Sequence, residues 1–160
     1  MKQAAKDGGR RNFGLAWLLL CLAFGLHIWD EAAHDFLRYY NATVLTLYSH
    51  FSWFPRIDLE FRRWLCGLLG GTLILLLFTP FAYRNARWLR APGYLFAGVQ
   101  LLNGFNHIVL TIRGRSVPSV VFDGPAPGFY TAPLLLVLSA FLFWSLRESR
   151  PQTAVSGRVM

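Results

Sequence analysis

Residues 13–31 read FGLAWLLLCLAFGLHIWDE, and this stretch decides the fold. Its first 14 residues carry no charged side chain, and its last five include His27, Asp30 and Glu31. A helix needs about 20 mostly apolar residues to cross a bilayer. The stretch therefore predicts a membrane-spanning helix that carries three titratable groups at its far end.

The rest of the chain has the same apolar character. Of its 160 residues, 54% are hydrophobic and 15% are charged, and the mean hydropathy is +0.37. A single domain of this length cannot hide so much apolar surface in its own core, so the expected solvent is a bilayer. Helices satisfy their own backbone hydrogen bonds in lipid. The composition therefore predicts an all-α integral membrane protein.

Three further apolar segments follow the first one. The predicted fold is a four-helix bundle, with transmembrane helices at about residues 12–40, 59–83, 91–112 and 130–147. A basic cytoplasmic tail, residues 1–11, precedes the bundle, and a second cytoplasmic tail, residues 149–160, follows it. Residues 41–57 are apolar and aromatic but too short to span, so we expect them at the membrane surface.

The formal charge of +8 comes from separate clusters of Lys and Arg. These clusters precede the first predicted helix, lie between the second and third, and follow the fourth. Loops on the cytoplasmic side carry the excess of Lys and Arg, so both termini are expected in the cytoplasm. This distribution favours a multi-pass protein of the inner (cytoplasmic) membrane and argues against nucleic-acid binding.

The titratable side chains at the end of the first helix share one face. At about 100° per residue, His27, Glu31 and His34 fall within about 60° of one another on a helix that continues to residue 40. Asp30 lies on the flank of this stripe. Ionisable groups inside a membrane are costly, so they are expected to face the bundle, pair with each other or bind a ligand.

The third predicted helix carries a second polar stripe, formed by Gln100, Asn103 and His107 with Asn106 beside them. Counted from the cytoplasmic surface at about 1.5 Å per residue, His27 and His107 both lie roughly 22 Å up their helices. Because their depths match, we expect the two stripes to face one polar site in the outer third of the membrane.

Imidazoles and a carboxylate on facing helices fit a divalent metal, either zinc or iron. The predicted metal ligands are His27, Glu31, His34 and His107. Asp30 and Asn103 are not expected to bind the metal themselves. They are expected to orient the imidazoles through hydrogen bonds, as groups next to metal ligands commonly do. Glu60, at the outer end of the second helix, is a candidate general base.

The same groups also suit metal-free acid/base chemistry. A carboxylic acid in an apolar, aromatic pocket can be kept protonated and can donate its proton to an alkene. The catalytic candidates for such an isomerase or cyclase are Glu31, Glu60 and Asp30, and the predicted substrate-binding residues are Asn103, Asn106, Trp29 and Tyr130. For both the metal-dependent and the metal-free enzyme, the expected partners are membrane lipid and a hydrophobic small-molecule substrate, a lipid or an isoprenoid.

The alternative to an enzyme is a small transporter or lipid-binding protein. In such a protein the same groups would relay protons or bind a lipid head group. Transporters bind near the midplane and use broken helices. Here the polar groups lie off-centre, and four helices are few for alternating access unless the chain forms a homo-oligomer. The sequence therefore favours an enzyme, with a structural accessory subunit as a third alternative.

Three segments resemble the HXXEE family of small, mostly bacterial, multi-spanning membrane proteins. HIWDE at 27–31 is similar to the His-x-x-Glu-Glu motif, with Asp30 in place of the first Glu. NGFNHIVLTI at 103–112 and PGFYTAPLL at 127–135 resemble its Asn-x-x-x-His segment and the start of its last helix. The resemblance implies a helical bundle whose site groups His27, Asp30, Glu31, Asn103 and His107. The residues of the metal-free acid/base hypothesis, a His and a Glu four residues apart with a Glu on the second helix and a later Asn, are also similar in type to those of emopamil-binding-type sterol isomerases.

Overall fold

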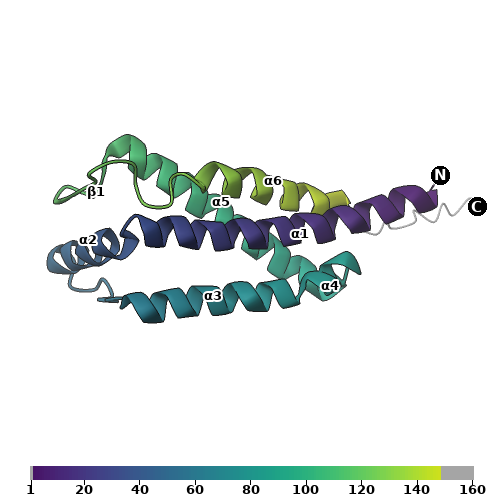
Figure 1. The fold of residues 1–160 in the computed structure, drawn as a ribbon, viewed down its shortest axis with the longest axis horizontal. Helices are drawn as coiled ribbons and strands as arrows, with labels where there is room; N and C mark the ends of the chain where they lie inside the picture. The colour runs from purple at the N-terminus through teal and green to yellow at the C-terminus, as the bar shows by residue number, and fades with distance from the viewer. Residues whose placement is uncertain (1, 149–160) are drawn as a thin grey trace, which may run out of the picture.

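The computed structural model describes residues 2–148, with side chains described for residues 12–148. The long helices are α1 Lys2–Ala33, α3 Phe61–Leu77, α5 Arg90–Arg113 and α6 Ala132–Glu148. The shorter elements are α2 Phe36–His50, α4 Thr79–Tyr83, the 3-10 helix η1 Arg87–Leu89, and the antiparallel strands β1 Arg115–Val117 and β2 Val120–Val121. In Figure 1 the long helices run side by side, and α2 and the hairpin lie together at one end. The predicted C-terminal tail, residues 149–160, lies outside the described residues.

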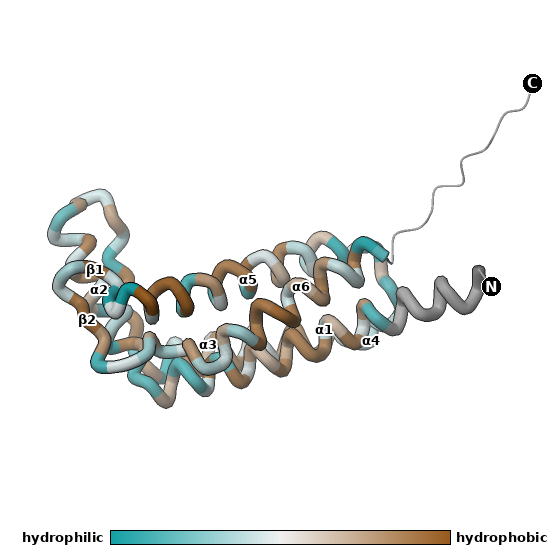
Figure 2. Tube along the Cα trace, turned by 90° about the horizontal axis from the view of Figure 1, so that it is seen from above, coloured by the Kyte–Doolittle hydropathy of each residue, from teal (hydrophilic) through white to brown (hydrophobic). Residues whose placement is uncertain are grey.

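Three helical segments are long and apolar enough to cross a membrane, namely Asn12–Ala33, Phe61–Tyr83 and Arg87–Arg113. Figure 2 shows hydrophobic residues along these helices and hydrophilic residues gathered toward the two ends of the long axis. The 17 residues of α6 extend about 26 Å, a little less than a hydrocarbon core of about 30 Å. The helical class and membrane-length helices are confirmed, while the four-span bundle and the side of the termini stay predictions.

The first helix ends earlier than predicted, at Ala33, and α2 begins at Phe36 after a sharp turn. Asp35 lies in this turn with a φ of 53°, a left-handed conformation that ends a helix without Gly or Pro. The Nδ1 of His34 lies 2.8 Å from the carbonyl oxygen of Asp30, so the imidazole adds a hydrogen bond to a backbone carbonyl in the last turn of α1. The turn directs α2 across the end of the bundle.

An apolar core joins α1, α5 and α6 in the half of the molecule away from α2. Its buried members include Phe13, Trp17, Leu20, Phe96, Ala97, Leu135, Leu142 and Leu146. The indole N–H of Trp17 donates to the carbonyl oxygen of Leu75 at 2.9 Å, which also ties α3 to α1. A Cβ on Gly104 would lie 2.9 Å from the carbonyl oxygen of Ala132, so this glycine allows α5 and α6 to approach closely.

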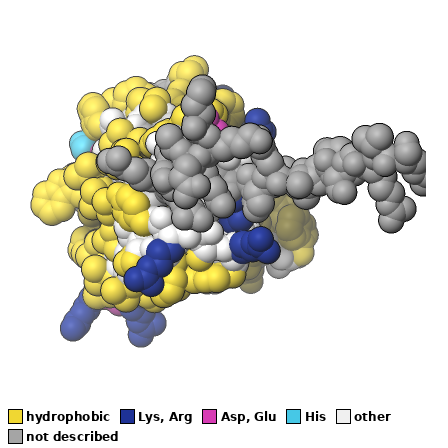
Figure 3. Space-filling view, turned by 90° about the vertical axis from the view of Figure 1, so that its right-hand side faces the viewer, with side chains coloured by type: hydrophobic (Ala, Val, Ile, Leu, Met, Phe, Trp, Pro, Cys, Tyr) yellow, Lys and Arg dark blue, Asp and Glu magenta, His cyan; other side chains and the backbone are white. Residues whose placement is uncertain are grey.

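The α3 helix packs against α1 and α4 and leaves much of its surface open. Leu73 and Leu77 on this helix are 62% and 71% exposed, as suits side chains that face lipid. Within residues 12–148, a Cβ built on Gly67, Gly70 or Gly71 meets nothing within 4 Å beyond its chain neighbours and the backbone of its own helix. Figure 3, which views the end where α4 lies, shows hydrophobic side chains over much of the visible flank and separate groups of Lys and Arg.

Hydrogen bonds hold α2 and the hairpin in place as a cap over one end of the bundle. The side-chain amide of Asn41 both donates to and accepts from the backbone of Leu59, each at 3.0 Å. The hydroxyls of Thr43 and Ser116 lie 2.6 Å apart, which joins α2 to β1. The cap therefore depends on polar contacts that local sequence patterns do not reveal.

Two glycine substitutions are expected to have opposite effects on stability. A Cβ on Gly14 would collide with the ring of Tyr83, so Gly14→Ala should destabilise the fold by about 1–3 kcal/mol. Gly70→Ala is the matched control, because it meets no neighbour and gains up to about 1 kcal/mol of helix propensity. Thermal unfolding in detergent measures both. Equal losses for the two variants would contradict the described packing.

Candidate metal centre

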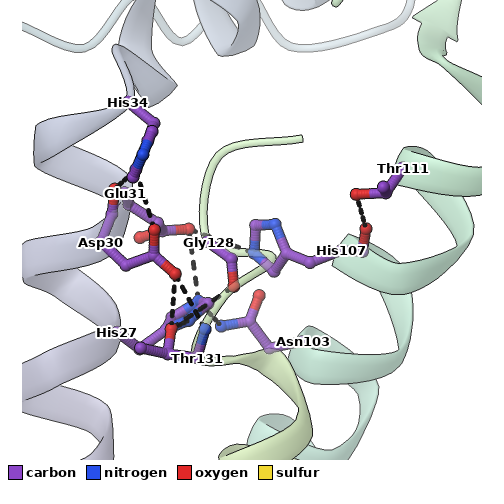
Figure 4. Close-up of polar contacts among 9 residues, drawn as sticks. All are labelled: His27, Asp30, Glu31, His34, Asn103, His107, Thr111, Gly128 and Thr131. Atoms are coloured by element: carbon purple, nitrogen blue, oxygen red, sulfur yellow. Dashed lines mark hydrogen bonds and ion pairs between the residues drawn. The ribbon is translucent and has the colours of Figure 1, made fainter. Parts of the chain in front are cut away.

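Two imidazoles and one carboxylate meet where α1 faces α5 (Figure 4). The Oε1 atom of Glu31 lies 3.5 Å from Nε2 of His27 and 3.2 Å from Nε2 of His107. The two imidazole rings lie edge to face, with centroids 4.8 Å apart. All three side chains are buried, although each can carry a charge. Such a group needs an internal partner, because burial removes the water that would solvate it.

The spacing of these atoms suits a metal ion. In a tetrahedral site with ligand bonds of 2.0–2.1 Å, neighbouring ligand atoms lie about 3.3 Å apart. The two distances from Glu31, 3.5 Å and 3.2 Å, lie on either side of that value. One ligand atom from each residue can be chosen so that all three lie within 4.8 Å of one another. The group of His27, Glu31 and His107 can therefore hold a metal ion, and the identity of the ion stays a prediction.

The far side of the His27 ring is held by Thr131, at the start of α6. The Nδ1 atom of His27 lies 2.8 Å from the Thr131 hydroxyl oxygen. That hydroxyl lies 2.9 Å from Oδ2 of Asp30, which also accepts the Thr131 backbone N–H at 2.9 Å. Asp30 thus acts on the imidazole through Thr131, and these bonds connect α1 to α6.

A loop of residues 126–131, here named the site loop, lies against both imidazoles. Gly128 in this loop has a φ of 84°, and a Cβ there would lie 2.7 Å from Cε1 of His27 and 2.9 Å from Cε1 of His107. The backbone N–H of Ala126 donates to the hydroxyl of Thr111, which donates in turn to the carbonyl oxygen of His107. A glycine is required at 128 both by its conformation and by this close approach.

Of the other residues predicted for the site, Asn103 contacts the group directly. Its Nδ2 atom is 3.0 Å from Nε2 of His27, on the side that faces Glu31. His34, predicted as a ligand, lies beyond the end of α1 with a 44% exposed side chain. Its Nδ1 is 2.9 Å from Oδ1 of Asp30, but its hydrogen bond goes to the Asp30 carbonyl, and its ring lies near Tyr130. The structure does not bring His34 into the group of three.

The remaining predicted residues lie on the surface. The Glu60 side chain is 60% exposed, and its Oε2 is 3.6 Å from Nε of Arg63. Trp29 and Tyr130 are 75% and 62% exposed, and Asn106 is also exposed. Sequence reasoning placed Gly128 and Thr131 in the segment that opens the last helix but included neither among the predicted site residues. The available signal was the PGFYTA segment, in which Pro-Gly and a Thr directly precede a helix.

Comparisons with models of known protein families, with curated proteins and with solved structures found no match to this chain. The chemistry of the site therefore carries the functional argument.

Gly128→Ala is expected to disturb the site without removing a polar group. The new Cβ would press on both imidazoles at a φ that disfavours L side chains, so we expect a loss of about 1–3 kcal/mol in unfolding free energy. Gly124→Ala is the matched control, since a Cβ there meets nothing within 4 Å. Unfolding in detergent compares the two variants, and equal stabilities would show that the site loop does not lie against the imidazoles.

Proposed function

We propose that this chain is a multi-pass membrane enzyme that uses a bound divalent metal, zinc or iron, on a lipophilic substrate. The observation that carries the proposal is the buried set of two imidazoles and one carboxylate at distances suited to coordination. The proposed ligands are His27, Glu31 and His107. The proposed topology puts both termini in the cytoplasm and the site toward the outer leaflet of the inner membrane, as the pattern of Lys and Arg favours.

The composition of the ligand set favours catalysis over a structural role. Structural zinc sites usually have four protein ligands and are rich in Cys, whereas catalytic sites have three protein ligands and keep one position for water or substrate. Cys21 is buried in the apolar core and Cys66 is exposed on α3, so neither belongs to this group. A metal bound here would polarise a substrate oxygen or activate a water molecule.

The chain's own residues can orient both the ligands and a substrate. Asp30 and Thr131 hold the His27 ring, and the Asn103 amide beside it offers a hydrogen bond to a substrate oxygen. Glu60 is left out of the proposed machinery, because it lies at the exposed start of α3 beside Arg63.

A lipid or isoprenoid substrate is supported by what surrounds the site. It lies within helices of membrane length, and apolar side chains such as Leu26, Leu102 and Phe105 on the same helices are exposed at this level. Phe36 stacks on Trp64 with ring centroids 5.6 Å apart and lies 6.4 Å from the ring of His107. Such surroundings suit the chain of a molecule dissolved in the bilayer.

A metal-free acid/base enzyme, an isomerase or cyclase, is the second candidate. The distance of 3.2 Å between Glu31 and His107 is within hydrogen-bond reach, so these two groups can share a proton without a metal. A transporter or lipid-binding protein has weaker support, because the polar group lies off-centre and the α1 segment at His27 is continuous helix.

Metal binding is expected at about one ion per chain in protein purified without chelator. Glu31→Gln and His107→Ala should each weaken zinc affinity by at least about 100-fold, more than the loss of an outer partner does. His34→Ala and His50→Ala are the controls and should bind nearly as wild type. Elemental analysis and titration against a competing chelator measure this. Wild-type protein without metal would exclude the metalloenzyme.

Turnover of a lipid is expected to depend on both Glu31 and the metal. Membranes from cells that express wild type should differ in one substrate–product lipid pair from membranes of cells that express Glu31→Gln, as measured by lipid mass spectrometry. Purified protein should convert that pair in nanodiscs and lose the activity with chelator. Activity that survives chelation but not Glu31→Gln would favour the acid/base enzyme, and no changed lipid would contradict an enzyme of either kind.

A further inference from the structure

The hydroxyl of Thr131 lies between a carboxylate and an imidazole. Its oxygen is 2.9 Å from Oδ2 of Asp30 and 2.8 Å from Nδ1 of His27. A hydroxyl has one proton to donate and can accept from other donors. The direction of these two hydrogen bonds therefore follows from which neighbour receives that proton.

Asp30 is placed to receive it. Its Oδ2 already accepts the backbone N–H of Thr131 at 2.9 Å and lies 2.9 Å from the Thr131 hydroxyl oxygen. A carboxylate oxygen that accepts an N–H offers its remaining lone pair to the hydroxyl, so it accepts and does not donate. The other oxygen near the hydroxyl is the carbonyl of Gly128 at 3.4 Å, which is also an acceptor. With either acceptor, Thr131 donates its only proton away from His27.

The proton between Thr131 and His27 must then belong to the imidazole. A neutral histidine carries one N–H and one bare nitrogen, so an N–H at Nδ1 leaves a lone pair on Nε2. This lone pair faces the Nδ2 of Asn103 at 3.0 Å and the Oε1 of Glu31 at 3.5 Å. An amide N–H at Asn103 is the donor that a bare nitrogen accepts. The Thr131 contact on one side of the ring and the Asn103 contact on the other thus agree on one tautomer. The nearer imidazole of His107, at 3.2 Å, supplies the donor for Glu31.

We propose that Thr131 is a positioning residue for His27. Because its hydroxyl donates to Asp30, it accepts the N–H at Nδ1 of His27, which leaves Nε2 of His27 bare and directed into the site. The role of Thr131 in metal coordination rests on the proposed function, whereas the tautomer of His27 does not. Thr131 directly precedes α6, and its backbone N–H donates to Asp30. The residue that docks α6 onto α1 therefore also fixes the tautomer of the imidazole.

The direct test is the tautomer of His27 in metal-free protein. Nitrogen NMR of histidine-labelled protein in detergent, assigned with His27→Gln, should show Nδ1 protonated and Nε2 bare. Thr131→Val removes the hydroxyl but keeps the backbone N–H to Asp30, so the ring should gain the form protonated at Nε2, which can donate to Glu31. Thr131→Ser should restore the wild-type signal. Wild-type protein protonated at Nε2 would overturn the proposal.

Zinc titration separates this proposal from the proposed function. Thr131→Val should bind zinc about 10- to 100-fold more weakly than wild type, and Thr131→Ser within a few-fold of it. If wild type binds zinc and Thr131→Val binds equally well, the positioning role fails while the metal site stands. If wild type binds no zinc, the metal function fails, and the tautomer still decides the role of Thr131. Should Thr131→Val not fold, the wild-type tautomer and Thr131→Ser remain decisive.

Discussion

The buried carboxylate of Glu31, held between two imidazoles, is the constraint on which the rest of the structure depends. A charge removed from water must be matched by a protonated partner or a metal, and removing one partner of such a buried pair costs about 3–5 kcal/mol. The two imidazoles beside it come from α1 and α5, and Thr131, the residue directly before α6, holds one of them. The polar contacts therefore set how three helices meet at this end. The apolar core around Trp17 holds them together at the other end.

The same arrangement explains why the site suits chemistry in a membrane. The site loop lies against the imidazoles through Gly128, and the cap of α2 and the hairpin covers the end of the bundle. Electrostatic interactions are stronger in such a water-poor place, so a few polar groups can bind a metal or move a proton effectively. Around them the helices expose apolar side chains that match a bilayer. These surroundings support the hydrophobic substrate that we propose.

Much of this architecture follows from hydropathy and depth. Apolar length predicts the spanning helices, and equal depth along two parallel helices predicts that His27 and His107 meet. The prediction for His34 depended on an unbroken helix, and the left-handed Asp35 breaks it without any Gly or Pro to signal the turn. Glu60 lies at the exposed start of α3 beside Arg63, and helical periodicity does not predict where the side chain of such a terminal residue points. The role of Thr131 depends on a loop that folds back over 100 residues from Asp30, and no local pattern encodes such a contact.

X-ray absorption spectroscopy of the metal-loaded protein tests the central claim most directly, because it reports which atoms surround the ion. We expect a first shell of nitrogen and oxygen at about 2.0–2.1 Å, with the outer scattering of two imidazoles. The contribution of one imidazole should disappear in His107→Ala. A shell that contains sulfur, or a spectrum unchanged by that substitution, would place the metal elsewhere and contradict the account.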